Sequence, residues 1–168
     1  TGVLDVTTAD NAGQADDVKV ITGTAATTVD GFSGDDVAID ADLIGDNTLV
    51  SVSGDAAFTV TGLEGDITAT SGSGSLDITL DDVNGSSDGE VVIDSNRTTV
   101  VDASALGSGD TLVLEGSGDI TVNDIATENV DATATTGSVT VNTAGITGTA
   151  ATGTDDAVSN YSDRIQEI

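Results

Sequence analysis

The chain has 168 residues, 30 acidic side chains against three Lys and Arg, a formal net charge of −27, and no Cys, Met, Trp, His or Pro. These counts exclude most catalytic sets, because a Ser or Cys nucleophile needs a neighbouring base, transition metals favour His and Cys, and phosphoryl transfer needs Arg or Lys. The chain also lacks the clustered cations that bind nucleic acid or anionic membrane surfaces. We therefore expect no enzyme and no nucleic-acid partner. We expect no membrane insertion either, since no apolar run approaches the ~20 residues that span a bilayer.

Short apolar runs rich in Val, Ile, Leu and Thr follow one another along the chain, separated by Gly, Asp, Ser and Asn. In chain order, clear examples are residues 3–7, 18–21, 48–52, 58–60, 77–80, 91–93, 111–114, 119–122 and 139–141. β-Branched residues, and the alternation of apolar with polar side chains, favour strands. A short helical turn is expected only near the C-terminus, starting from Ser159 or Ser162. The sequence therefore predicts an all-β protein.

The spacing of the predicted strands favours a parallel β-solenoid. Successive strands start roughly nine or ten residues apart, a spacing found in sandwiches, barrels and solenoids. An antiparallel sandwich needs many tight hairpins, but the chain has only three Asn-Gly or Asp-Gly pairs, at residues 30–31, 84–85 and 88–89. A solenoid needs no such turns and tolerates few aromatic side chains, because stacked turns bury ladders of small aliphatic residues. β-Sandwich modules remain the alternative.

Internal repeats divide the chain into modules. The hexapeptide Ile-Thr-Gly-Thr-Ala-Ala at Ile21 returns at Ile146, and residues 47–80 align with 110–142 at an offset of 62 or 63. In this alignment Thr48 falls on Thr111 and Phe58 falls on Ile120. Residues 3–9, 75–81 and 138–144 look like three openings of the same unit. We therefore predict repeat modules at 1–73 and 74–136, with the start of a third repeat and a C-terminal tail at 137–168.

The acidic residues gather in glycine-rich turns. Of the 30 carboxylates 25 are Asp, and residues 31–39, 107–115 and 116–124 each place Gly and Asp just ahead of an apolar strand. Ca²⁺ takes six to eight oxygen ligands, and the backbone must bend to offer its carbonyls as well. The candidate metal-binding residues are Gly31, Gly34, Asp35, Asp36, Asp110, Asp119, Asp155 and Asp156. The alternative is ordinary turn chemistry of Asp, on an acidic surface that keeps a secreted or halophilic protein soluble.

The segments "VITGTAATTVDGFSGDDVAIDADLIGDNTLVSVSG" and "GSGDITVND" resemble the calcium-binding, type I-secreted bacterial repeat proteins of the RTX class. They resemble more closely the β-strand-repeat S-layer proteins and giant adhesins. Against the nonapeptide G-G-x-G-x-D-x-U-x, residues 31–39 keep Gly31, Gly34 and Asp36, but have Phe32 and Ala38 at the second Gly and the large aliphatic position. The closing "DDAVSNYSDRIQEI" is similar to the end of an RTX block. The resemblance implies Ca²⁺ binding, secretion and an extracellular or cell-surface location.

Two functions follow as expectations, with a third as the weakest. The first is a structural module of a calcium-stabilised surface protein that assembles with copies of itself, head to tail, into an S-layer or filament. The second is a spacer or ligand-binding region of a giant adhesin, with a cell-surface glycan as a further partner. An enzyme on a β-helix is weakest, because the three cations of the chain lie far apart in sequence. A glycan site also has little support, since sugars usually stack on aromatic rings and the chain has three.

Overall fold

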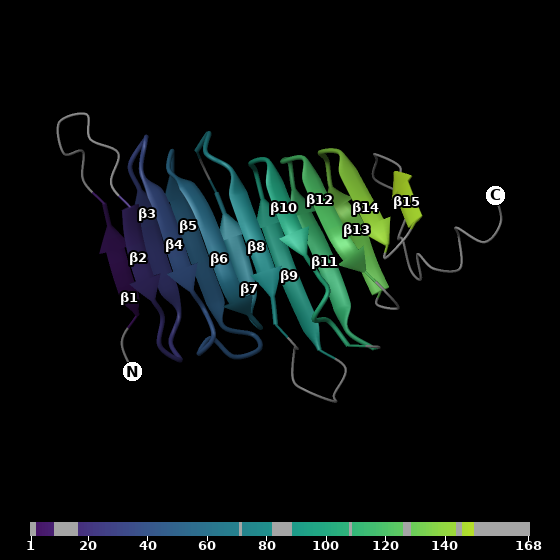
Figure 1. Cartoon of the computed structure of the whole chain (residues 1–168), viewed down its shortest axis with the longest axis horizontal. Helices are drawn as coiled ribbons and strands as arrows, with labels where there is room; N and C mark the ends of the chain where they lie inside the picture. Colours follow the sequence, from purple (N-terminus) through teal and green to yellow (C-terminus); the bar gives the residue numbers. More distant parts are fainter. Residues whose placement is uncertain are drawn as a thin grey trace.

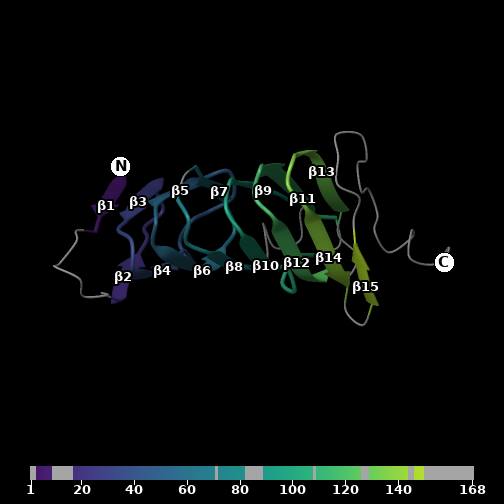
Figure 2. The ribbon, with the colours of Figure 1, turned by 90° about the horizontal axis from the view of Figure 1, so that it is seen from above.

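The chain folds into a parallel β-solenoid of about six turns, as the computed structural model shows. The structure describes residues 3–8, 17–70, 72–81, 89–107, 109–125, 129–143 and 146–149. Two β-sheets lie face to face, and the chain passes from one sheet to the other in each turn (Figures 1 and 2). The predicted parallel β-solenoid is confirmed. The predicted helical turn and the candidate ligands Asp155 and Asp156 lie outside the described residues.

Odd-numbered strands form one sheet, here sheet A, and even-numbered strands with the last strand form the other, sheet B. Sheet A contains β1 (Leu4–Thr7), β3 (Thr27–Gly31), β5 (Leu49–Gly54), β7 (Asp66–Ala69), β9 (Glu90–Ser95), β11 (Thr111–Gly116) and β13 (Asn129–Thr135). Sheet B contains β2 (Asp17–Ile21), β4 (Asp36–Asp40), β6 (Ala57–Leu63), β8 (Leu76–Leu80), β10 (Thr99–Asp102), β12 (Ile120–Ile125), β14 (Val139–Thr143) and β15 (Ile146–Thr149).

Neighbouring strands are parallel throughout both sheets, except that β15 pairs antiparallel with β14. Parallel neighbours need a long crossover connection. Here that crossover is the strand in the opposite sheet with its two turns, so the scarcity of hairpin dipeptides in the sequence has a structural reason. One turn takes 17 residues from Leu49 to its partner Asp66 and 26 residues from Ile67 to its partner Ile93.

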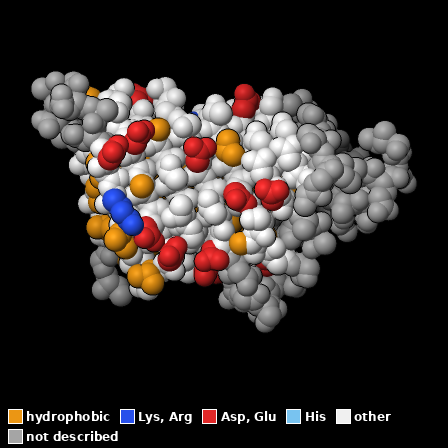
Figure 3. Space-filling view, in the orientation of Figure 1, with side chains coloured by type: hydrophobic (Ala, Val, Ile, Leu, Met, Phe, Trp, Pro, Cys, Tyr) orange, Lys and Arg blue, Asp and Glu red, His pale blue; other side chains and the backbone are white. Residues whose placement is uncertain are grey.

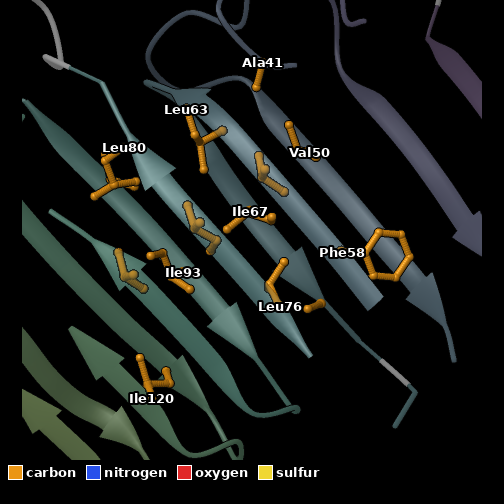
Figure 4. Packing of buried hydrophobic residues seen from close by; sticks show 14 of the residues in the cluster. Ala41, Val50, Phe58, Leu63, Ile67, Leu76, Leu80, Ile93 and Ile120 are labelled. Carbon is orange, nitrogen blue, oxygen red and sulfur yellow. The ribbon is translucent and has the colours of Figure 1, made fainter. Parts of the chain in front are cut away.

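The core is the space between the two sheets. In β8, Leu76, Ile78 and Leu80 point inward and are buried, while Asp77 and Thr79 are exposed. This alternation places one apolar face of each sheet against the other, because successive strand residues point to opposite sides. The buried side chains form one cluster that runs from Val20 to Val141, and Figure 4 shows part of it.

The sequence repeat corresponds to three turns of the solenoid. The aligned segments contain β5 and β11, β6 and β12, and β7 and β13, which are each three turns apart. In sheet B the repeat agrees with the strand register, because Phe58, Leu76, Thr99 and Ile120 form one buried ladder. In sheet A it does not. Val50 shares its ladder with Ile67, Ile93 and Leu114, whereas the repeat places Val50 on Val113, one residue away and on the opposite face.

Two other sequence similarities do not correspond to equivalent places. The three similar openings fall on β1, β8 and β14, and β1 belongs to sheet A whereas the other two belong to sheet B. The returning hexapeptide also differs in context. Ile21 ends a parallel strand and is followed by a turn, whereas Ile146 begins the antiparallel strand β15. Short identical segments therefore take the structure that their neighbours in the stack impose.

Candidate functional site

The turns that lead from sheet A to sheet B, here called the A-to-B turns, hold most of the predicted metal ligands. They follow β3, β5, β7, β9, β11 and β13 and stack in a column along one side of the solenoid. Gly31, Gly34, Asp35 and Asp36 lie at the turn after β3, and Asp119 lies at the turn after β11. Asp110 lies at the opposite side, in the turn before β11. The structure therefore does not bring the predicted ligands together in one place.

The turn at residues 31–36 uses its two glycines for different reasons. Gly34 has a φ of 96°, a left-handed conformation that favours glycine. Gly31 is buried, and a Cβ there would overlap the Cβ of Ala56 and lie 2.7 Å from Cζ of Phe58. Gly31 is therefore needed for close packing between turns, whereas Gly34 provides the bend that the sequence predicted.

The two acids of this turn lie in different environments. Asp35 is only 4% exposed, whereas Asp36 is exposed at the start of β4. The backbone of Asp35 is well bonded, because its N–H donates to Phe32 O at 3.2 Å and its carbonyl accepts from Ala57 N at 3.1 Å. The structure thus separates the two carboxylates between interior and surface. Their joint binding of one Ca²⁺ stays a prediction.

Asx side chains in the A-to-B turns tie each turn to the next one. Oδ1 of Asp119 accepts a hydrogen bond from the backbone N–H of Ser138 at 3.0 Å. Oδ1 of Asp55 accepts from the N–H and the hydroxyl of Ser73, at 2.8 and 3.2 Å. The amide oxygen of Asn96 makes the same two bonds with Ser117, at 3.1 and 2.9 Å. The side-chain oxygens satisfy backbone donors that the strands leave unpaired. Asp119 therefore has a structural role in the described fold.

Asp110 closes the opposite turn. Its side chain is buried, and Oδ1 accepts from Gly89 N at 2.9 Å while Oδ2 accepts from Gly107 N at 2.7 Å. Both carboxylate oxygens thus bond backbone N–H groups, one of them in the same turn and the other in the preceding turn of the solenoid. This is the turn chemistry of Asp that the sequence offered as the alternative to metal binding.

Arg97 is a buried cation that is not among the predicted site residues. Its side chain is only 4% exposed, and its guanidinium donates to Gly54 O at 2.9 Å and to Ala56 O and Gly74 O at 3.4 Å each. Cζ of Arg97 also lies 5.2 Å from the centroid of the Phe58 ring. Burial lowers the pKa of Arg97, and the nearby carboxylate of Asp55 opposes that effect. One signal for Arg97 was available in the sequence: at the repeat offset of 62 residues, Arg97 falls on Asp35, which is a predicted site residue.

Strand register also brings acids together on the outer faces. Asp36 is the neighbour of Asp17 in sheet B, and Glu115 is the neighbour of Asp94 in sheet A. Neighbouring strands are ~4.8 Å apart, and like charges directly opposite each other destabilise a sheet. With three Lys and Arg for 30 acids, the chain itself supplies few partners. Acidic side chains spread over the face seen in Figure 3. These pairs depend on register, so the sequence alone identified Asp36 but not its neighbour.

Neither pair is a complete metal site by itself. Among the described residues no group of three or more His, Cys, Asp or Glu could hold a metal ion. Lys19 meets one carboxylate of this surface, with its Nζ 3.4 Å from Oδ2 of Asp40, and both side chains are partly or largely exposed. An ion bound at a two-carboxylate pair would complete its coordination with water or backbone carbonyls.

A shallow hollow of about 520 Å³ lies on the outer face of sheet B near the N-terminal end. Small side chains form part of its floor, because Ala38 and Ala57 stand where larger residues would fill it. Its lining includes Asp17, Asp36, Asp77 and Lys19. A polar, uncharged ligand such as a glycan would find hydrogen-bond acceptors here, although Phe58, the aromatic residue that lines the hollow, is itself buried.

Comparisons with known proteins identify no relative. The chain matches no protein-family model, no curated protein and no solved structure. In the described part of the chain, no helix is long and apolar enough to cross a membrane.

Proposed function

We propose that this chain is a non-enzymatic structural module of a secreted surface protein, stabilised by calcium and assembling with copies of itself. The observation that carries the proposal is that the described strands at the N-terminal end of the solenoid have open edges. There β1 and β2 are the outermost described strands of sheets A and B, so each has one edge without a described neighbour. Unpaired strand edges recruit further strands unless they are blocked.

The core is also incompletely covered at this end. Leu4, Val6 and Val18 pack against the core but are only half-buried, whereas their ladder partners inside the stack are buried. Among the described residues, most of the exposed large hydrophobic ones lie in the N-terminal part of the sequence: Val3, Ile21, Phe32, Leu43 and Leu49, against Val100 alone further along. A further β-turn stacked on this end would bury apolar area, which stabilises by about 25 cal/mol per Å².

Calcium enters the proposal through charge. A formal charge of −27 on 168 residues destabilises the folded chain through self-repulsion, and it makes copies of the chain repel one another. The pairs Asp17–Asp36 and Asp94–Glu115 concentrate that repulsion on the two outer faces. Divalent cations bound at such positions would stabilise the fold by mass action and allow two acidic molecules to approach.

The second candidate is a spacer of a giant adhesin, and the strand β15 favours it. At the C-terminal end β15 lies antiparallel on β14, so the described part of sheet B ends there in a reversed strand. Parallel stacking cannot continue directly on a reversed strand. Head-to-tail growth in both sheets is therefore hindered at this end, whereas a spacer needs no such growth.

The experiment is a Ca²⁺ titration followed by light scattering and negative-stain microscopy, with chelator as the starting point. Parent protein is compared with Val6→Lys, at the half-buried N-terminal end, and with Val100→Lys, on the outer face of β10. The two variants add the same charge. We expect Ca²⁺ to raise the mass of the parent and of Val100→Lys, but not of Val6→Lys.

Three outcomes would contradict parts of the proposal. A parent protein that stays monomeric at every calcium and protein concentration would contradict self-assembly and would favour the function as an adhesin spacer. Circular-dichroism melts that coincide in chelator and in millimolar Ca²⁺, at low ionic strength, would contradict stabilisation by calcium. If molar NaCl stabilises as well as millimolar Ca²⁺, halophilic adaptation explains the acidity instead.

A further inference from the structure

The A-to-B turns share one equivalent position that faces inward, and in two of the turns this position holds a charged residue. This position lies two residues before the ladder Val37–Phe58–Leu76–Thr99–Ile120 of sheet B. The residues that occupy it, in order along the solenoid, are Asp35, Ala56, Gly74, Arg97 and Gly118. Small residues thus stand in the two turns immediately before Arg97. They leave a space along the inside of the column that a larger side chain would fill.

The side chain of Arg97 occupies this space. It extends from its own turn past Gly74 to the turn after β5, where Nη2 donates to Gly54 O at 2.9 Å and Nη1 lies 3.4 Å from Ala56 O. A third carbonyl, that of Gly74, accepts from Nη1 in the turn between them. The guanidinium therefore connects three turns, because Arg97 lies in the turn after β9 and its side chain bonds the backbone of the turns after β5 and β7.

Glycine keeps these carbonyls accessible. A Cβ on Gly72 would lie 2.6 Å from Nη2 of Arg97, and Gly72 has a φ of 119°. A Cβ on Gly74 would overlap the carbonyl of Ala56. The turns thus approach each other closely, and their carbonyl oxygens converge on one point beneath the column. The Phe58 ring lies next to this point, 5.2 Å from Cζ of Arg97.

Converging carbonyls beside an aromatic ring are what a cation site requires, because oxygen dipoles and the negative face of the ring both attract positive charge. We propose that the A-to-B column contains a backbone cation site whose resident cation is the guanidinium of Arg97. Without that side chain, the site accepts a free guanidinium-class cation. A planar guanidinium fits better than an ammonium ion or Ca²⁺, because its fixed donors meet separate carbonyls.

This inference does not rest on the proposed calcium-dependent function. It assigns the turns after β5, β7 and β9 a cation that belongs to the chain, so this part of the solenoid holds together without added metal. Any stabilisation by Ca²⁺ then acts elsewhere, for example at the outer carboxylate pairs. All tests of the site are therefore run in chelator, where a failure of the calcium proposal has no effect on the result.

The first test compares Arg97→Ala with Lys19→Ala, which removes the same charge from an exposed surface pair. Arg97→Ala leaves three carbonyls without their donor, so we expect its thermal midpoint to fall by roughly 10 °C. Lys19→Ala should change the midpoint by about 2 °C or less. Guanidinium chloride at low millimolar concentration should then raise the midpoint of Arg97→Ala by about 3 °C relative to equal NaCl. Parent and Lys19→Ala should show no such rise.

A second variant and a measurement on the unmodified protein keep the inference testable if Arg97→Ala does not fold. Arg97→Lys retains the charge but not the fork, so it should have an intermediate midpoint. In ¹⁵N spectra of the parent, Arg97 side-chain N–H protons should exchange slowly with water, and much more slowly than those of freely solvated arginine. Fast exchange of Arg97 would overturn the proposal. So would equal midpoints for Arg97→Ala and Lys19→Ala, or a folded Arg97→Ala that methylammonium stabilises as well as guanidinium does.

Discussion

Asp35 and Arg97 occupy the same buried position of the solenoid, three turns apart, each two residues before a member of one ladder. The separation of 62 residues is also the offset of the sequence repeat. One copy of the repeat therefore buries an acid where the next copy buries a base. A buried charge is costly without partners. Because an acid needs hydrogen-bond donors and a base needs acceptors, the surroundings of this position must differ between the two copies. The strands repeat, but the electrostatics of the turns differ.

The different burial of Asp35 and Asp36 gives the first prediction. Asp36→Asn should weaken Ca²⁺ binding measured by calorimetry and change the thermal midpoint little, because its side chain is exposed next to Asp17. Asp35→Asn should shift the midpoint by several degrees and leave Ca²⁺ binding intact, because its carboxylate is buried. Equal heats in the parent and Asp36→Asn would exclude Asp36 as a ligand. A matching loss of binding in both variants would instead support a shared site in this turn.

Asp110 provides a test between metal binding and turn chemistry. Asp110→Ala leaves the N–H groups of Gly89 and Gly107 without their acceptor, and should lower the free energy of unfolding by about 2–4 kcal/mol. Asp110→Asn keeps one acceptor oxygen and should cost less than Asp110→Ala. The stoichiometry of Ca²⁺ binding should be the same in Asp110→Asn and the parent. A loss of one bound ion would show that Asp110 is a ligand after all.

Close stacking of the A-to-B turns predicts a strong effect of Gly72→Ala. The new Cβ would overlap Gly54 O, and the φ of 119° strains any side chain there. We expect a loss of about 2–4 kcal/mol in the free energy of unfolding. Gly45→Ala is the matched control, because no atom lies within 4 Å of its added Cβ, and it should change stability by about 0.5 kcal/mol or less. Similar losses for both variants would contradict the stacking.

The solenoid itself could be predicted because its signals are local. Alternation in segments such as residues 76–80 identifies strands, and the shortage of hairpin dipeptides disfavours repeated antiparallel turns. The reversed strand β15 could not be predicted, because the same hexapeptide occurs at Ile21 without forming a reversed strand. Its direction depends on what the last parallel turn offers, which sequence similarity does not contain.

The candidate site could be predicted less well than the fold. The sequence located the glycine and aspartate turns, and Gly34 has the backbone conformation expected of it. It could not show that Asp119 and Asp110 bond backbone N–H groups of neighbouring turns, because those partners are about 20 residues away. Arg97 was missed for the same reason, since its acceptors in the turn after β5 lie more than 40 residues earlier in the chain.

Register in sheet A distinguishes the structure from the sequence repeat, and it gives the last prediction. The structure places Leu114 on the buried ladder of Val50, Ile67 and Ile93, and leaves Val113 half-buried on the outer face. Leu114→Ala should therefore cost about 2–5 kcal/mol, because it opens a cavity in the core. Val113→Ala should cost about 1 kcal/mol or less, mainly through lost strand propensity.

The repeat alignment predicts the reverse order, because it pairs Val113 with the buried Val50 and so turns Leu114 outward. Urea midpoints of the two variants, compared at equal slope of the transition, decide between the registers. Equal slopes matter here, because an array of stacked turns can unfold in parts when one turn is weakened. A larger loss for Val113→Ala than for Leu114→Ala would mean that β11 pairs one residue away from the register described, with every side chain of that strand on the other face.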